Sequence, residues 1–112
     1  MDLSTKDRPG LRIVKVHDSR IDAAVAIQFK DKMRDVTQDG PKRVILDLSD
    51  VTFIDSSGLG AVVAAMKLLH GAHILELAGL TPVVAKVFKL TRMESVFKIH
   101  DSVGSVLARM AS

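Results

Sequence analysis

Two spacings of apolar residues alternate along the chain, one typical of strands and one typical of helices. Residues 11–16 (LRIVKV) alternate apolar and basic side chains as a half-exposed strand does, and Pro-Gly at 9–10 predicts a turn from a short N-terminal strand. Residues 43–48 form an apolar, β-branched run that predicts a buried strand. Residues 73–77 and 96–99 predict two further short strands.

Apolar residues recur every three or four positions in four other stretches, which we predict to be helices. These are residues 23–38, residues 57 to about 69, the stretch that follows Thr81-Pro82, and the stretch that follows Asp101-Ser102. We expect Asp22 to cap the first helix and Gly71 to form the C-cap of the second. In the first helix, Ala26, Phe29 and Met33 should face the core.

Strands that alternate with helices imply an α/β fold with a mostly parallel central sheet and crossover helices. We predict one domain over residues 1–112, with a mixed sheet of four to five strands and about four helices. The N-terminal strand would add an antiparallel pair at one edge. Binding sites in such folds tend to lie where strands lead into helices.

One such junction carries an unusual polar group, Asp55-Ser56-Ser57-Gly58. A Ser or Asp side chain at a helix start accepts hydrogen bonds from the unpaired N–H groups of the first turn. The helix dipole also favours a negative group such as a phosphate at this position. Spacing alone leaves two interpretations open, because Asp55, Ser56 and Ser57 could all be capping residues or could form a modification site.

The composition limits the class of protein. Hydrophobic residues make up 47% of the chain, but Lys67 and His70 interrupt the longest apolar stretch, so we expect no membrane insertion. The N-terminus MDLSTKDRPG does not follow the plan of a signal peptide and cysteine is absent, which favours a cytoplasmic protein. The net charge is +3 with acidic and basic residues interspersed, and no aromatic residues lie among the basic residues at 86–98 that would indicate direct nucleic-acid binding.

The motifs of common enzyme classes are missing. The sequence has no phosphate-binding G-x-x-x-x-G-K-[ST] loop, and the Gly58-Leu59-Gly60 segment lacks the third glycine of a dinucleotide fingerprint. Ser56 does not lie in a G-x-S-x-G elbow, and no spacing ties it to a histidine base. His70 and His73 have no acidic or thiol companion for a metal ion. We therefore expect no catalytic activity, cofactor or metal.

The helix after the serine pair is apolar almost all round. One stripe, which includes Leu59, Val62 and Leu69, should pack on the sheet. The other side carries Ala61, Ala64, Ala65 and Leu68, with Lys67 as the only charge. Such a helix is either buried on both sides or partly exposed to a partner. In the second case, a phosphate on the neighbouring serine could block docking through its charge and its desolvation cost.

These residues resemble a known family. Asp55-Ser56-Ser57-Gly58-Leu59-Gly60, between the strand VILDLSDVTFI and a helix of small residues, is similar to the signature of the STAS domain in bacterial anti-sigma-factor antagonists. Ile21-Asp22 and the C-terminal segments VFKLT and VFKI extend the resemblance over nearly the whole chain. Two positions depart from the family pattern, since Ser19-Arg20 replaces the usual Gly-Glu and Arg92 occupies a position where glycine is common.

The resemblance implies partner switching in bacterial signal transduction and transcription regulation. In that family, the unphosphorylated domain binds an anti-sigma factor that is also a serine kinase and so frees a sigma factor. The kinase phosphorylates the domain, and a PP2C-type phosphatase removes the phosphate. Carried over by position, the acceptor is Ser56, Ser57 is a first-turn hydroxyl that could exchange roles with it, and Asp55 shapes the loop. The implied partner surface comprises Asp22, Asp55, Ser57, Gly58, Leu59, Ala61, Ala64, Ala65 and Leu68.

STAS domains also serve as accessory subunits or scaffolds of membrane transport and sensory complexes, without a phosphorylation cycle. This is the alternative function that the resemblance allows. The intact serine pair and the lack of a membrane segment favour switching over this alternative. A neighbouring gene for a histidine-kinase-like ATPase would favour switching, and one for an ABC permease would favour transport.

Overall fold

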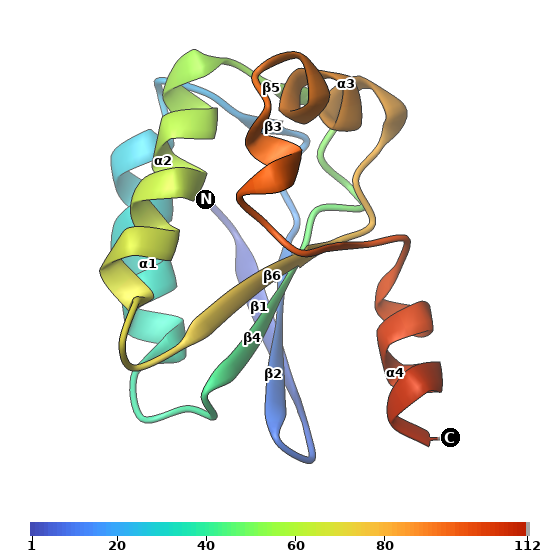
Figure 1. The fold of residues 1–112 in the computed structure, drawn as a ribbon. Helices are drawn as coiled ribbons and strands as arrows, with labels where there is room; N and C mark the ends of the chain where they lie inside the picture. Colours follow the sequence, from blue (N-terminus) through green and yellow to red (C-terminus); the bar gives the residue numbers. More distant parts are fainter. Residues whose placement is uncertain (112) are drawn as a thin grey trace.

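The hairpin predicted at the N-terminus forms one edge of a five-stranded sheet in the computed structural model, which describes residues 1–111 (Figure 1). Strands β1 (Leu3–Arg8) and β2 (Leu11–Val16) are antiparallel, and Gly10 between them has a φ of +80°, which glycine adopts easily. The parallel strands β4 (Arg43–Asp47), β6 (Ile74–Ala78) and β7 (Ile99–His100) follow in the order β1-β2-β4-β6-β7.

Helices lie on both faces of this sheet (Figure 1). On one face, α1 (Ala26–Thr37) packs beside α2 (Ser56–Leu69). On the other face lies α4 (Val103–Ala111). Helix α3 (Pro82–Leu90) and the short 3-10 helix η1 (Met93–Ser95) connect β6 to β7. The predicted α/β class, the mixed sheet and the four helices are therefore confirmed for the described residues.

The central strand β4 is buried on both faces. Val44 and Leu46 belong to the large core under α1 and α2, which also contains Phe29 and Met33. Ile45 belongs to a smaller core on the α4 side, formed with Leu11, Ile13, Ala78 and Val106. Because both faces are covered, the strand reads as a continuous apolar run rather than as an alternation.

Two further short strands form a small sheet that positions the predicted site. Strand β3 (Arg20–Ile21) pairs in parallel with β5 (Phe53–Ile54). The backbone N–H groups of Thr52 and Phe53 both donate to the Ser19 carbonyl oxygen, at 2.8 and 3.2 Å. As a result, the segment before α1 and the segment before α2 run side by side, although more than thirty residues separate them.

The prediction that Asp22 caps the first helix is wrong. Helix α1 begins at Ala26, and its N-cap residue Val25 has no side chain that could cap it. The Asp22 Oδ1 atom instead accepts a hydrogen bond from the Ala24 N–H at 3.1 Å, only two residues away. This local bond stabilises a turn and delays the start of the helix.

The strand predicted at 96–99 is also misplaced. Phe97 is buried and meets the Phe88 ring edge-on, with centroids 5.9 Å apart. Packing against α3 therefore determines the position of Phe97, and strand pairing begins only at Ile99. The predicted strand at 73–77 lies one residue later, at Ile74–Ala78.

Two predicted helix ends and one departure from the family pattern can be compared with the structure. Gly71 has a φ of +96° just after α2, in the left-handed conformation expected of a glycine at a helix C-terminus. Helix α3 begins at Pro82, as expected from the Thr81-Pro82 pair, but the Thr81 hydroxyl donates to the Val51 carbonyl oxygen at 2.7 Å and does not cap the helix. Arg92, which replaces a glycine common in the resembled family, has a φ of +60°. A side chain in this conformation costs about 1 kcal/mol or more relative to glycine.

Among residues 1–111, the helices are too short or too polar for any of them to cross a lipid bilayer.

Candidate partner-binding site at the start of helix α2

The Asp55 carboxylate fixes the start of helix α2, where the two serines lie. Asp55 is the N-cap residue of α2, and its Oδ1 atom accepts a hydrogen bond from the Gly58 N–H at 2.8 Å. Its Oδ2 atom accepts a second hydrogen bond from the Ala23 N–H at 3.3 Å. One side chain therefore caps α2 and holds the turn that contains Asp22 against it. The predicted role of Asp55 in shaping the loop fits these two contacts.

Gly58 is required by close packing at the same junction. A Cβ atom at this position would lie 1.8 Å from the Ile21 carbonyl oxygen, which belongs to the backbone of β3 and cannot rotate away. The first turn of α2 therefore approaches the β3 backbone more closely than any other residue type would allow. Gly60 differs, because a Cβ atom there would have no neighbour within 4 Å.

Both serines are exposed in the first turn of α2. Ser56 is the first residue of the helix and Ser57 the second, since the N-cap position is already occupied by Asp55. Neither hydroxyl forms a hydrogen bond with any residue in 1–111. The interpretation that all three residues are caps therefore applies to Asp55 alone, and both serines are exposed to solvent.

The exposed part of the predicted partner surface is narrower than expected. Gly58, Leu59, Ala61 and Ala65 are buried, and Ala61 and Ala65 share the large core with Phe29 and Met33 of α1. The apolar helix is thus covered on one side by the sheet and on another by α1. The prediction that Gly58, Leu59, Ala61 and Ala65 contact a partner is therefore corrected, because a partner cannot reach buried residues.

A single face of α2 remains open to solvent. It carries Ser56, Ser57, Gly60, the half-exposed Ala64, Lys67 and Leu68, of which Leu68 is 50% exposed. These positions recur at spacings of three and four residues, so they form one continuous stripe that starts at the serines. Of the predicted partner residues on α2, Ser57, Ala64 and Leu68 belong to this exposed stripe.

Arg20 of β3 and Phe53 of β5 lie in the same region, and neither was predicted as part of the site. The Arg20 guanidinium lies 4.0 Å from the centre of the exposed Phe53 ring, and its Nε atom lies 3.3 Å from Asp22 Oδ2. Arg20 and Phe53 are register partners in the small sheet. The sequence marked Arg20 only as a departure from the family pattern, because the pairing of two-residue strands cannot be read from periodicity.

The hydrogen bonds of three histidines lie outside this site. His100 bonds Glu76, His73 bonds the Pro41 carbonyl oxygen, and His17 bonds Ser4, so these three imidazoles are all engaged away from Ser56. No group of three His, Asp or Glu side chains within residues 1–111 has an arrangement that could hold a metal ion.

Comparison with known proteins places the chain in a family. The model of the STAS domain matches residues 2–106. The anti-sigma-B factor antagonist of Staphylococcus aureus is 22% identical over 102 residues, which cover 90% of this chain and 94% of that protein. STAS anti-sigma factor antagonists are regulators without enzymatic activity, in agreement with the expectation from the sequence.

Solved structures share the fold. The crystal structure of an anti-sigma factor antagonist from Mycobacterium paratuberculosis superposes with a TM-score of 0.83 at 22% identity, covering 99% of this chain and 94% of that one. The Bacillus cell fate determinant SpoIIAA in its phosphorylated form superposes with a TM-score of 0.67 at 19% identity, covering 97% and 99% of the two chains. The matched family model, the strand order and the Asp55-to-Gly60 loop agree, and this chain belongs to the STAS domain family.

Proposed function

We propose that this protein is an anti-sigma factor antagonist that works by partner switching. Its unphosphorylated form binds an anti-sigma factor that is also a serine kinase, and so releases the target of that factor. Phosphorylation of Ser56 abolishes the binding, and a PP2C-type phosphatase restores it. The observation that carries the proposal is the exposed Ser56 hydroxyl, which has no hydrogen-bond partner in residues 1–111 and lies at the start of the exposed stripe of α2.

The position of Ser56 supports a switch that changes docking without changing the fold. A phosphate on the first residue of a helix interacts favourably with the helix dipole, typically by 0.3–1 kcal/mol for each charge. The neighbouring Asp55 carboxylate opposes this by a similar amount in a solvated site. The two effects nearly cancel within the folded domain, so the phosphate acts mainly on whatever binds over it.

A partner that docks on the α2 stripe would have to cover this phosphate. Burying a charge of about −1.5 to −2 without a matching cation costs several kcal/mol at an interface. A loss of about 3 kcal/mol weakens binding roughly a hundredfold. Ser57, Ala64 and Leu68 of the exposed stripe would contact the partner, together with Asp22, whose turn is held against Asp55 by the Ala23 N–H.

Phosphosite mapping tests the first half of the proposal. We expect protein purified from its own cells to contain a fraction heavier by one phosphate, which maps to Ser56 and disappears in Ser56→Ala. The matched control is Ser57→Ala, which should keep the modification. A phosphate that disappears in Ser57→Ala instead would move the acceptor by one residue. No modification under any growth or stress condition would favour the transport or scaffold function.

Calorimetry tests the second half, with the histidine-kinase-like ATPase encoded nearest to this gene as the binding partner. Wild type and Ser56→Ala should bind with similar affinity, and Ser56→Asp should bind roughly a hundredfold more weakly with an unchanged melting temperature. Equal binding by wild type and Ser56→Asp would refute the switch.

A further inference from the structure

Strand β1 forms a six-residue edge of the sheet that no other strand of residues 1–111 covers. It lies at the end of the order β1-β2-β4-β6-β7, and its only neighbour in the sheet is β2. Four consecutive residues of the strand, from Ser4 to Asp7, are exposed. The strand at the opposite edge, β7, has only two residues. The β1 edge therefore offers the longer row of backbone groups to a further strand.

The register of the hairpin shows which backbone groups of β1 point outward. The His17 N–H donates to the Asp2 carbonyl oxygen at 2.9 Å, so Asp2 and His17 face each other as a hydrogen-bonded pair. Hydrogen-bonded pairs alternate with unbonded pairs along an antiparallel ladder. In the observed register, the N–H and C=O groups of Leu3, Thr5 and Asp7 therefore point away from β2.

Two charged side chains lie near the two ends of this edge. Side chains alternate along a strand, so Asp2 and Arg8 share one face of the sheet, on which Arg8 lines a hollow beside α4. The Arg8 Nη1 atom donates to the outward Asp7 carbonyl oxygen at 3.0 Å, which holds the guanidinium along the open edge. Neither Asp2 nor Arg8 forms an ion pair within residues 1–111.

We propose that the β1 edge pairs with the β1 edge of a second copy of this chain, antiparallel and around a twofold axis at Thr5. In this register Thr5 faces Thr5 of the second copy, and Leu3 faces Asp7 of the second copy. Every outward residue is then paired, and each pair exchanges two backbone hydrogen bonds. A carbonyl oxygen has two lone pairs, so the contact between Arg8 and the Asp7 carbonyl oxygen does not prevent this pairing.

The charges of the β1 edge fit the same register. Asp2 faces Arg8 of the second copy, and the twofold axis repeats this contact, so both unpaired charges are neutralised in each copy. No like charges face each other directly. With the axis at Lys6 instead, the Lys6 side chains of the two copies would meet. The outward backbone groups and the charges therefore both favour a second copy as the partner of this edge.

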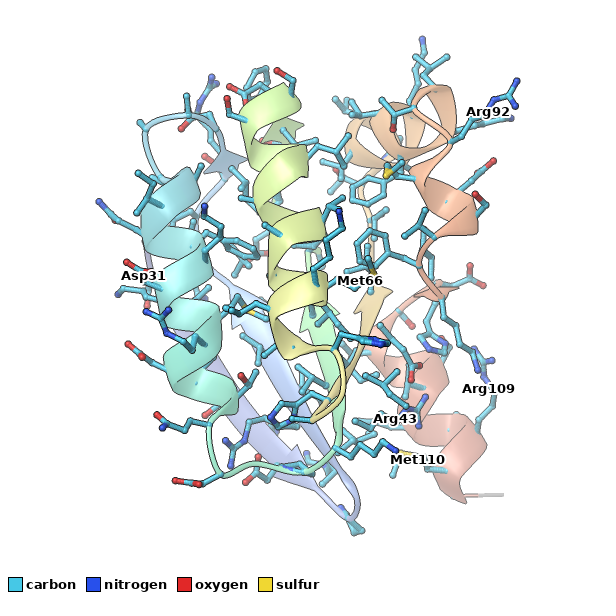
Figure 2. The ribbon with its side chains drawn as sticks, turned by 60° about the vertical axis from the view of Figure 1, so that its left-hand side comes forward. Asp31, Arg43, Met66, Arg92, Arg109 and Met110 are labelled. Carbon is cyan, nitrogen blue, oxygen red and sulfur yellow. The ribbon has the colours of Figure 1, made fainter. Side chains whose placement is uncertain are left out.

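This pairing keeps both faces of the sheet covered. The twofold axis between two paired strands runs perpendicular to the sheet, so each face continues into the same face of the second copy. Figure 2 shows α1, with the labelled Asp31, and α4, with the labelled Arg109, on opposite sides of the sheet. The dimer would carry both α1 helices on one face and both α4 helices on the other. The interface does not involve the exposed stripe of α2, and it does not rest on the proposed function.

Sedimentation velocity of the whole protein over a range of concentrations tests the pairing. A short strand pair buries less surface than a standard interface of about 1,600 Å², so we expect a weak and reversible dimer. The sedimentation coefficient should therefore rise with concentration between about 10 µM and about 1 mM, from the value of a monomer towards that of a dimer. A monomer at every concentration in this range would overturn the proposal.

A charge swap identifies the interface. Arg8→Asp and Asp2→Arg each place like charges opposite each other, and each should weaken the dimer about tenfold. The double variant faces opposite charges again and should regain the wild-type affinity. Lys86→Asp changes the net charge as much as Arg8→Asp does, at an exposed position on α3, and should leave the affinity unchanged. A dimer that both single variants leave intact, or that the double variant does not regain, would refute this pairing.

Discussion

The buried Glu76 carboxylate should make the unfolding free energy of this domain depend on pH. The variant Glu76→Gln should remove this contribution to the pH dependence. In Glu76→Gln the side chain keeps its shape but cannot ionise, so its pairing with the Arg43 guanidinium loses its charge. Glu94 is the other glutamate of the chain, and it lies exposed in η1. Glu94→Gln is therefore a matched control for the chemical change.

The size of the effect follows from the pKa of Glu76, which the hydrogen bonds from Arg43 lower from 4.5 to about 2. This difference corresponds to about 3 kcal/mol of folding free energy. A carboxyl whose pKa is lower in the folded state binds fewer protons there than in the unfolded chain. Its contribution is therefore complete above about pH 5 and is lost as the pH falls towards 2, with about 2 kcal/mol lost by pH 3.

Urea unfolding at a series of pH values between 7 and 3 measures this loss. The unfolding free energy of wild type minus that of Glu76→Gln should shrink by about 2 kcal/mol over this range. Taking the difference at each pH removes the contribution of carboxylates that both proteins share. Glu94→Gln should follow wild type throughout. A wild-type minus Glu76→Gln difference that does not change with pH would refute the assignment of this dependence to Glu76.

Three further substitutions test the local geometry by thermal unfolding. Asp55→Ala removes the hydrogen bonds to the Gly58 and Ala23 N–H groups and should cost about 2 kcal/mol, while Asp55→Asn, which still caps α2, should recover about half; equal losses would contradict the double role of Asp55. Gly58→Ala should destabilise by about 3 kcal/mol or prevent folding, whereas Gly60→Ala should stabilise α2 by up to about 1 kcal/mol, and similar effects of the two would contradict the close approach at Gly58. Arg92→Gly should stabilise by about 0.5–1 kcal/mol because Arg92 has a φ of +60°, and a loss of stability would show that the Arg92 side chain matters more than its backbone.

Local signals in the sequence predicted most of the fold. The Pro-Gly turn at 9–10 predicted the hairpin, and apolar spacing predicted the four helices and the core-facing residues of α1 and α2. These signals are strong because turn chemistry and helical periodicity act within a few residues. The errors occurred where distant contacts override local preference. Phe97 reads as part of a strand but packs on Phe88, and Asp22 reads as a cap but stabilises a turn.

The site was predicted less completely than the fold for the same reason. Ala61 and Ala65 are small and apolar, so the sequence does not show whether another helix or a partner covers them. In the structure, α1 packs beside α2 and helps to cover both residues. The pairing of Arg20 with Phe53 and of Arg43 with Glu76 depends on strand register between segments far apart in the chain. Neither the exposed Arg20–Phe53 contact nor the Arg43–Glu76 pair has a periodic signature in the sequence.

The structure also separates the roles of the residues in the Asp55-to-Gly60 motif. Asp55 caps the helix, Gly58 permits the close approach of α2 to β3, and Leu59 fills the core. Hydrogen bonding and packing therefore account for these three residues. They do not account for Ser56 and Ser57, which are exposed and whose hydroxyls form no hydrogen bond within residues 1–111, or for Gly60, where an added Cβ atom would meet no atom of these residues within 4 Å. Their position on one open helix face beside a rigidly held loop supports the proposal that a partner binds this face and that a kinase modifies it.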